Sequence, residues 1–106
     1  MARYMFQSTY TAEGTKGLLK EGGSKRRAVV EEVVNSIGGK LEAFYFACGE
    51  SDVIVIIEAP DNVSATAASL AVNASGAVHL KTTVLLTPEE IDTAVKKSVS
   101  YRPPGK

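Results

Sequence analysis

Residues 40–58, KLEAFYFACGESDVIVIIE, decide how the rest of the chain is arranged. The stretch contains two segments, Leu41–Cys48 and Val53–Glu58, whose aromatic and β-branched residues are typical of strands. The Gly49–Asp52 segment between them indicates a turn, since glycine adopts positive φ and an aspartate side chain can bond its own backbone. We therefore predict a β-hairpin. Its second segment is apolar on both sides, so we expect a central strand that is covered on both faces.

Other segments with strand or helix patterns lie before and after this hairpin. The predicted order is a strand over Ala2–Tyr10, a weak helix over Thr11–Glu21, a helix from an N-cap at Ser24 to about Ile37, the hairpin, a helix from an N-cap at Asp61 to about Gly76, a strand over Ala77–Leu86, and a helix that follows an N-cap at Thr87. This order predicts a ferredoxin-like α+β fold, βαββαβ, with a four-stranded antiparallel sheet, helices on one face and an extra C-terminal helix. Residues 1–100 are expected to form one domain, and residues 101–106 an extended proline-rich arm.

The spacing of apolar residues predicts which side of each element is buried. The expected inward sets are Tyr4, Phe6, Ser8 and Tyr10 in the first strand; Val30, Val33, Val34 and Ile37 in the second helix; Val63, Ala67, Leu70, Ala71 and Ala74 in the third; and Ile91, Ala94, Val95 and Val99 in the last. Helices cover only one face of the predicted sheet, yet its central strand is apolar on both. We therefore expect a homodimer in which two sheets pack face to face.

Composition narrows the classes of function. The chain has 12 basic and 12 acidic residues, and this zero net charge argues against a nucleic-acid partner. One cysteine, Cys48, excludes an intrachain disulfide, and with a single histidine it excludes the usual zinc site, so we expect no metal or other cofactor. The chain begins directly with a strand pattern and lacks a secretion signal, so we predict a cytoplasmic protein with no membrane partner.

Several stretches of the sequence resemble the GYD domain family of small bacterial and archaeal proteins. They are Tyr10–Gly14 (YTAEG), Gly17–Ser24 (GLLKEGGS), Gly38–Tyr45 (GGKLEAFY), Ala59–Asn62 (APDN) and Lys81–Thr83 (KTT), and the resemblance covers nearly the whole chain. The family's name-giving motif is a glycine followed by Tyr-Asp at the hairpin turn; Gly49 and Asp52 match it, and Ser51 replaces the tyrosine. The resemblance implies a dimeric α/β-barrel fold but no particular activity.

His79 is the one side chain that titrates near neutral pH without a perturbed environment. Strand alternation places it on the face opposite the helices, where it is a candidate catalytic base. A polar patch within a dimer interface is the simpler interpretation. We also predict a ligand pocket whose residues can hydrogen-bond a small molecule: Tyr10, Tyr45, Gln7 and Lys81.

The second helix starts with an unusual cluster of positive charge. Its predicted first turn contains Ser24, Lys25, Arg26 and Arg27, and cations there oppose the helix dipole. A bound anion would account for them. The alternative is a solvated basic turn that pairs with Glu31 or with an acidic residue of a neighbouring subunit.

These observations support two classes of function. The first is a homo-oligomeric module that binds a small ligand or builds an assembly, with the C-terminal arm linking dimers. The alternative is a cofactor-independent enzyme of the oxygenase or isomerase type, acting on a small aromatic or carbonyl compound. There His79 would be the base and a tyrosine would polarise the substrate. A cavity lined by His79 together with Tyr10 or Tyr45 would favour the enzyme.

Overall fold

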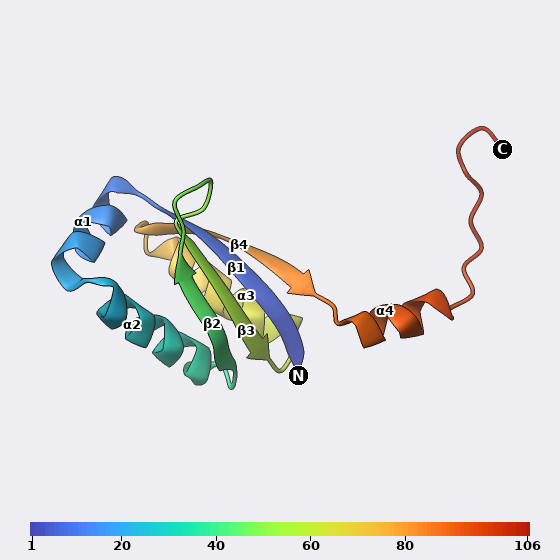
Figure 1. Ribbon diagram of the computed structural model, residues 1–106, viewed down its shortest axis with the longest axis horizontal. Helices are drawn as coiled ribbons and strands as arrows, with labels where there is room; N and C mark the ends of the chain where they lie inside the picture. Colours follow the sequence, from blue (N-terminus) through green and yellow to red (C-terminus); the bar gives the residue numbers. More distant parts are fainter.

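The computed structural model describes all 106 residues and has the α+β ferredoxin-like fold that the sequence predicts. The elements are β1 (Ala2–Tyr10), α1 (Ala12–Glu21), α2 (Gly23–Ser36), β2 (Lys40–Phe46), β3 (Val53–Ala59), α3 (Asn62–Ala74), β4 (Val78–Leu85) and α4 (Pro88–Val95) (Figure 1). The strands form one sheet in the order β2-β3-β1-β4, and every neighbouring pair is antiparallel.

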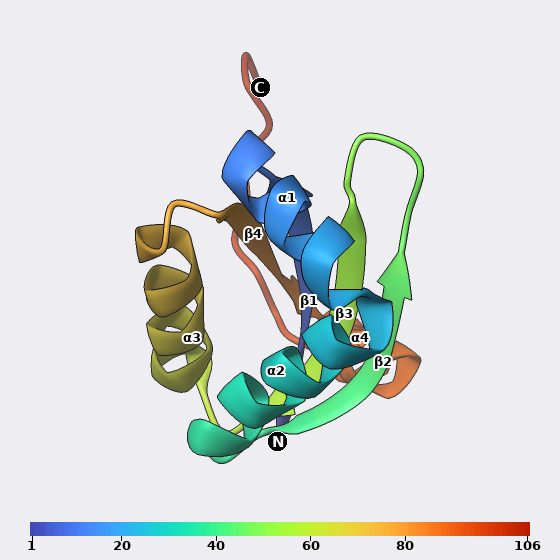
Figure 2. The same cartoon turned by 90° about the vertical axis from the view of Figure 1, so that its left-hand side faces the viewer.

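Helices α1, α2 and α3 lie on one side of the sheet, and no helix covers the other face, although α4 projects on that side (Figure 1 and Figure 2). Helix α4 belongs neither to the sheet nor to the layer of helices α1–α3. It projects beyond the end of β4, and the C-terminal residues extend further away from the sheet (Figure 1). We call the face without helices the open face.

The hydrophobic core lies between the two central strands and helices α2 and α3. Its largest fully buried side chains are Tyr4, Ile57 and Val34. The Tyr4 hydroxyl donates a 2.6 Å hydrogen bond to Asn62 Oδ1 at the start of α3, so even this buried polar group has a partner. The predicted inward faces of β1 and α2 are confirmed: alternate β1 residues from Tyr4 to Ser8 are buried, and the α2 valines pack against the core.

The predicted buried face of α3 is wrong. Val63 and Leu70 are 79% and 65% exposed, and the residues that contact the sheet are Ala65 and Ala68. Helix α3 is apolar around most of its circumference, so the spacing of apolar residues did not distinguish its two sides. The structure buries the side with smaller residues because small side chains let the helix approach the sheet closely.

Three further predictions are corrected. Ser24 is not an N-cap, because α2 already begins at Gly23. The N-cap is Gly22, whose φ of 84° ends α1 and which has no side chain to cap the helix. Strand β2 ends at Phe46 rather than Cys48. Asp52 does not bond its own backbone; its Oδ2 accepts the Tyr10 N–H at 2.8 Å and so ties the hairpin turn to the end of β1.

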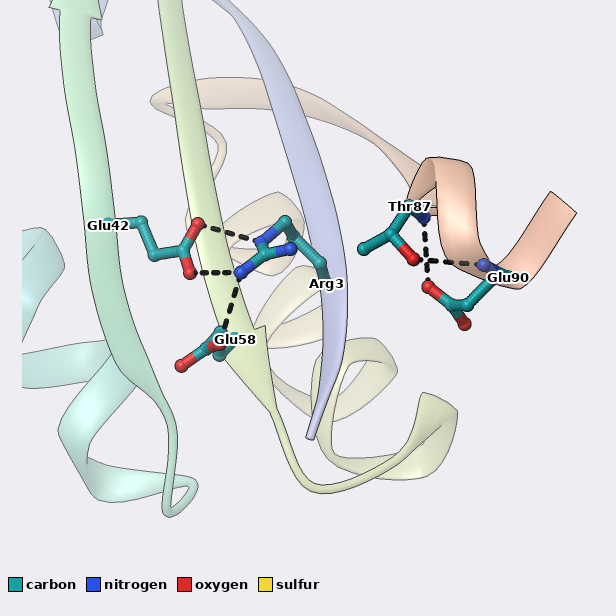
Figure 3. Close-up of polar contacts among 5 residues, drawn as sticks. All are labelled: Arg3, Glu42, Glu58, Thr87 and Glu90. Carbon is teal, nitrogen blue, oxygen red and sulfur yellow. Dashed lines mark hydrogen bonds and ion pairs between the residues drawn. The ribbon is translucent and has the colours of Figure 1, made fainter. Parts of the chain in front are cut away.

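The predicted buried stripe of the last helix is also wrong. Helix α4 ends at Val95, so Val99 lies beyond it, and every residue from Pro88 onward is exposed. The helix N-terminus itself is as predicted. Thr87 and Glu90 form a capping box, with Glu90 N–H bonded to Thr87 Oγ1 at 3.1 Å and Thr87 N–H to Glu90 Oε1 at 2.9 Å (Figure 3).

Candidate functional site

A polar hollow with a volume of about 450 Å³ lies at one end of the open face. Strand register creates it, since Thr9 pairs with His79 and Gln7 pairs with Lys81 across β1 and β4. The turn between β2 and β3 contributes Glu50 and Ser51. The complete lining is Gln7, Thr9, Glu50, Ser51, Asn73, His79, Leu80 and Lys81. Ser51, the residue at the expected tyrosine position of the motif, is therefore in the wall of this hollow.

The four residues predicted to form a ligand pocket do not come together. Gln7 and Lys81 line the hollow, whereas Tyr10 points to the helix side of the sheet. Tyr45 belongs to the open face, in register with Ile54, which in turn pairs with Gln7. The Tyr45 side chain is 70% exposed and does not line the hollow. Hence His79 shares its hollow with neither tyrosine.

The middle of the open face is apolar. Met5, Ile54 and Ile56 are half-buried there, beside the exposed Tyr45. We call these four residues the open-face patch. Val53, Val55 and Ile57 of the same central strand are buried by the helices. Within one protomer, β3 is therefore fully covered on one face only, although the sequence predicts cover on both.

An ion cluster borders the patch on the side away from the hollow. Arg3 bonds both carboxylate oxygens of Glu42 at 2.8 Å, and its Nη2 also contacts Glu58 at 3.3 Å (Figure 3). The pairing of β2 with β3 shifts between Leu41 and Ala43, a β-bulge whose extra residue is Glu42. Bulges redirect side chains, and this one lets Glu42 reach Arg3. The hydrogen bonds from Arg3 lower the pKa of Glu42 below its ordinary value of 4.5.

The wall of the hollow at the free edge of β4 is held by Asn73 of α3. Its Oδ1 accepts the Leu80 N–H at 2.7 Å, and its Nδ2 donates to the Leu80 carbonyl at 3.2 Å. The side-chain amide thus makes the two hydrogen bonds that a neighbouring strand would make. It satisfies the backbone N–H and carbonyl of Leu80, which would otherwise be unpaired at this edge of the sheet. This fixes the backbone between His79 and Lys81.

The predicted anion site separates into two parts. Ser24, Lys25 and Arg27 are exposed, whereas Arg26 is half-buried and faces a second cavity on the helix side of the sheet. That cavity, about 170 Å³ in volume, lies between α2 and α3 above the central strands, and 13 of its 16 lining residues are hydrophobic. We call it the α2–α3 groove. Tyr10 also lines it; burial raises the pKa of Tyr10, and the nearby Arg26 opposes that shift.

The structure holds no cluster of three or more His, Cys, Asp or Glu side chains that could bind a metal ion, and Cys48 is exposed. No helix has both the length and the apolar character needed to span a bilayer.

Sequence reasoning missed three features of the site region. The α2–α3 groove is formed by residues from all four strands and two helices, so no local pattern shows it. The Glu42 bulge has only a weak signature in the sequence. Glu42 and the adjacent Ala43 both face away from the helices, so the strand alternation is broken there. Asn73 had one detectable signal, the single amide in the last two turns of α3.

Comparison with known proteins identifies one family. The family model described as GYD domain matches residues 4–95, which include all four helices and all of the sheet except the first two residues of β1. No curated protein matches the chain. The match ends where α4 ends, so the C-terminal residues from Lys96 onward lie outside it.

Proposed function

This chain belongs to the GYD domain family, and we propose that it works as a homodimer that binds a small polar ligand between its two facing sheets. The polar hollow on the open face is the observation that carries this proposal, because it gathers side chains of unlike chemistry next to an uncovered apolar surface. The family membership supplies no activity, so the side chains of the hollow are what indicate the function.

The open-face patch supports the dimer. Ile54, Ile56 and Met5 lie side by side on neighbouring strands, with Tyr45 exposed next to them. Full burial of one large aliphatic side chain contributes about 1.5–3 kcal/mol, so covering this patch is strongly favourable. A second copy provides the same surface and therefore matches it across a two-fold axis.

The composition of the hollow supports a small polar ligand. Gln7 offers an amide, Thr9 and Ser51 offer hydroxyls, and Lys81 offers a positive charge. Glu50 supplies a negative charge in the same wall, so the site suits a molecule that both donates and accepts hydrogen bonds. A partner sheet laid on the open-face patch would close the neighbouring hollow to water, which strengthens each of these bonds.

The enzyme alternative has one observation in its favour: His79 lines the hollow together with Glu50 and Lys81. An imidazole within hydrogen-bond reach of a bound molecule can act as a proton donor or acceptor. However, the tyrosine that this mechanism requires as a polariser is absent from the hollow, since Tyr10 and Tyr45 lie elsewhere. Ligand binding therefore stands ahead of catalysis.

Native mass spectrometry of the full chain tests both parts of the proposal. We expect a mass that contains two chains or a multiple of two, with a retained small molecule. Ile54→Glu should break the sheet-to-sheet contact, whereas Val63→Glu, which changes an equally apolar but 79% exposed residue on α3, should leave it intact. His79→Ala should lose the ligand and keep the dimer. A single-chain mass for the unmodified protein would refute the proposal.

A further inference from the structure

Helix α4 carries an apolar surface that nothing in its own protomer covers. Ile91 and Val95 lie one turn apart on the helix, and they are 46% and 74% exposed. Leu86 before the helix and Val99 after it are 57% and 78% exposed. Apolar residues scattered singly on a surface are ordinary, but four of them along one projecting segment mark a contact surface.

The short length of α4 also indicates that the helix packs against another surface. It has eight residues, and isolated helices shorter than about 12–15 residues are marginal in water. The Thr87–Glu90 capping box stabilises its first turn, but no packed face stabilises the rest. A helix this short that stands apart from its domain requires a partner.

The α2–α3 groove is the complementary feature. Its walls include Val29, Val30 and Val33 of α2 and Ala68 and Val72 of α3. A dry apolar cavity of about 150 Å³ accepts a molecule the size of benzene, so this groove of about 170 Å³ can take branched aliphatic side chains.

The chain cannot fill its own groove with its own α4. Strand β4 lies at the sheet edge under α3, and the groove lies on the far side of that helix. Only Leu86 and Thr87 connect β4 to α4, and two extended residues span about 7 Å. The diameter of a helix with its side chains is about 10–12 Å, so this link is too short to cross α3.

Charges on the two helices fit each other in a parallel alignment. Helix α2 has Lys25 and Arg27 near its start and acidic residues, Glu31 and Glu32, about one and a half turns later. The α4 segment has the opposite order, with Glu89 and Asp92 first and Lys96 and Lys97 after them. In a parallel alignment, the positive start of α2 lies beside the acidic start of α4, and the acidic middle of α2 lies beside the lysines that follow α4. Such exposed pairs contribute little energy individually, but they select the orientation.

We propose that α4 docks in the α2–α3 groove of a second copy of this chain. Ile91 and Val95 enter the groove, and Glu89 and Asp92 neutralise the cations at the start of the partner's α2. The groove and the open-face patch lie on opposite sides of the sheet, so one chain can use both at once. Exchange of α4 then joins dimers into assemblies larger than two chains.

Cysteine cross-linking tests this contact directly. In a Cys48→Ser background, one chain carries Val29→Cys and a separately tagged chain carries Val95→Cys. Mild oxidation of the mixture should link the two chains, because a disulfide forms only where the Cα atoms come within about 7 Å. A chain with Leu19→Cys on α1, which is 83% exposed, replaces the first chain as the control and should not be linked to Val95→Cys. Equal linkage of both pairs would overturn the proposal.

Sedimentation measurements give the second readout. Val95→Asp should raise the dissociation constant of the larger assembly roughly 10-fold to 100-fold, the cost of losing one buried aliphatic side chain. Leu19→Asp should leave it unchanged. High salt should weaken the assembly, and Arg27→Glu should do so too unless Asp92→Lys is introduced with it.

The two proposals fail in different ways. If only the contact of α4 is absent, the unmodified chain stays at two copies and Val95→Asp changes nothing. If only the sheet-to-sheet dimer is absent, Ile54→Glu changes nothing while the Val29→Cys and Val95→Cys chains still cross-link. A small molecule that occupies the α2–α3 groove while Val95→Asp has no effect on mass would overturn the inference made for α4.

Discussion

Two glycines of α1 offer a sharp test of how this helix is seated. Gly14 and Gly17 lie one turn apart in the same ten-residue helix. A methyl group at Gly14 would overlap the Ala77 carbonyl oxygen, whereas a methyl group at Gly17 would have no neighbour within 4 Å. We expect Gly14→Ala and Gly17→Ala to change the free energy of unfolding in opposite directions.

The magnitudes follow from the contacts at this position. To accommodate a methyl group at Gly14, α1 has to move by about 1.5 Å or more, since that carbon would lie 2.0 Å from the Ala77 carbonyl oxygen and non-bonded atoms pack at about 3.5–4 Å. That movement strains the bond from Thr11 N–H to Ala77 O, now 3.1 Å, and the Thr11 hydroxyl bond to Gly76 O, now 3.0 Å. Two such bonds contribute about 1 kcal/mol each, and overpacking costs about 1–3 kcal/mol.

Alanine also has a better helix propensity than glycine, by about 1 kcal/mol. The net expectation for Gly14→Ala is therefore a loss of about 1–3 kcal/mol, and for Gly17→Ala a gain of about 0.5–1 kcal/mol. Because each kcal/mol corresponds to about 4–8 °C in a domain of this size, thermal unfolding resolves the difference. Both variants must be measured at one protein concentration, since association also shifts the unfolding temperature. Equal stabilisation by both substitutions would show that α1 does not rest on Ala77.

Three further outcomes can be measured. Asn73→Ala should lower the free energy of unfolding by about 1–2 kcal/mol and speed amide exchange at Leu80. Asn73→Asp should not restore the stability, because a carboxylate leaves the Leu80 carbonyl without a donor. Arg3 lowers the pKa of Glu42 below its ordinary value of 4.5. The stabilisation from this pair is therefore fully present above pH 4.5, the ordinary value, and it is lost as the pH falls through the lowered pKa. Glu42→Gln should therefore flatten the acid side of the stability profile, and an unchanged slope would refute this. Thr87→Ala should cost α4 about 1 kcal/mol of helix stability, seen as increased fraying in NMR chemical shifts, while resonances of the sheet stay unchanged.

The open-face patch and the apolar surface of α4 would produce different kinds of assembly. In the proposed dimer, the open-face patch meets a copy of itself, and such a contact closes the pair. Helix α4 and the α2–α3 groove are two different surfaces. In the proposed contact, a chain that receives α4 from one neighbour and gives its own α4 to another makes a heterologous contact, which can extend an assembly until it closes. A protein with both surfaces can therefore build rings or cages from dimers.

Part of the site was accessible from the sequence. Strand alternation alone placed Gln7, His79 and Lys81 on the face opposite the helices, and the register of β1 with β4 agrees. Strand alternation does not show which turn lies beside these three residues. Glu50 and Ser51 join the hollow only because β3, which follows their turn, starts beside β1, and Asn73 joins it only because α3 lies along β4.

The sequence by itself determined the features that depend on local chemistry. The order of elements, the inward valines of α2 and the capping box at Thr87 all arise from residues within a few positions of one another. The inward side of α3, the groove beside it and the detachment of α4 depended on tertiary structure. Helix α3 is apolar on two sides, and only its distance from the sheet selects the side with alanines. Helix α4 has a regular apolar stripe, but a stripe specifies that something must cover it, not which surface of which chain does so.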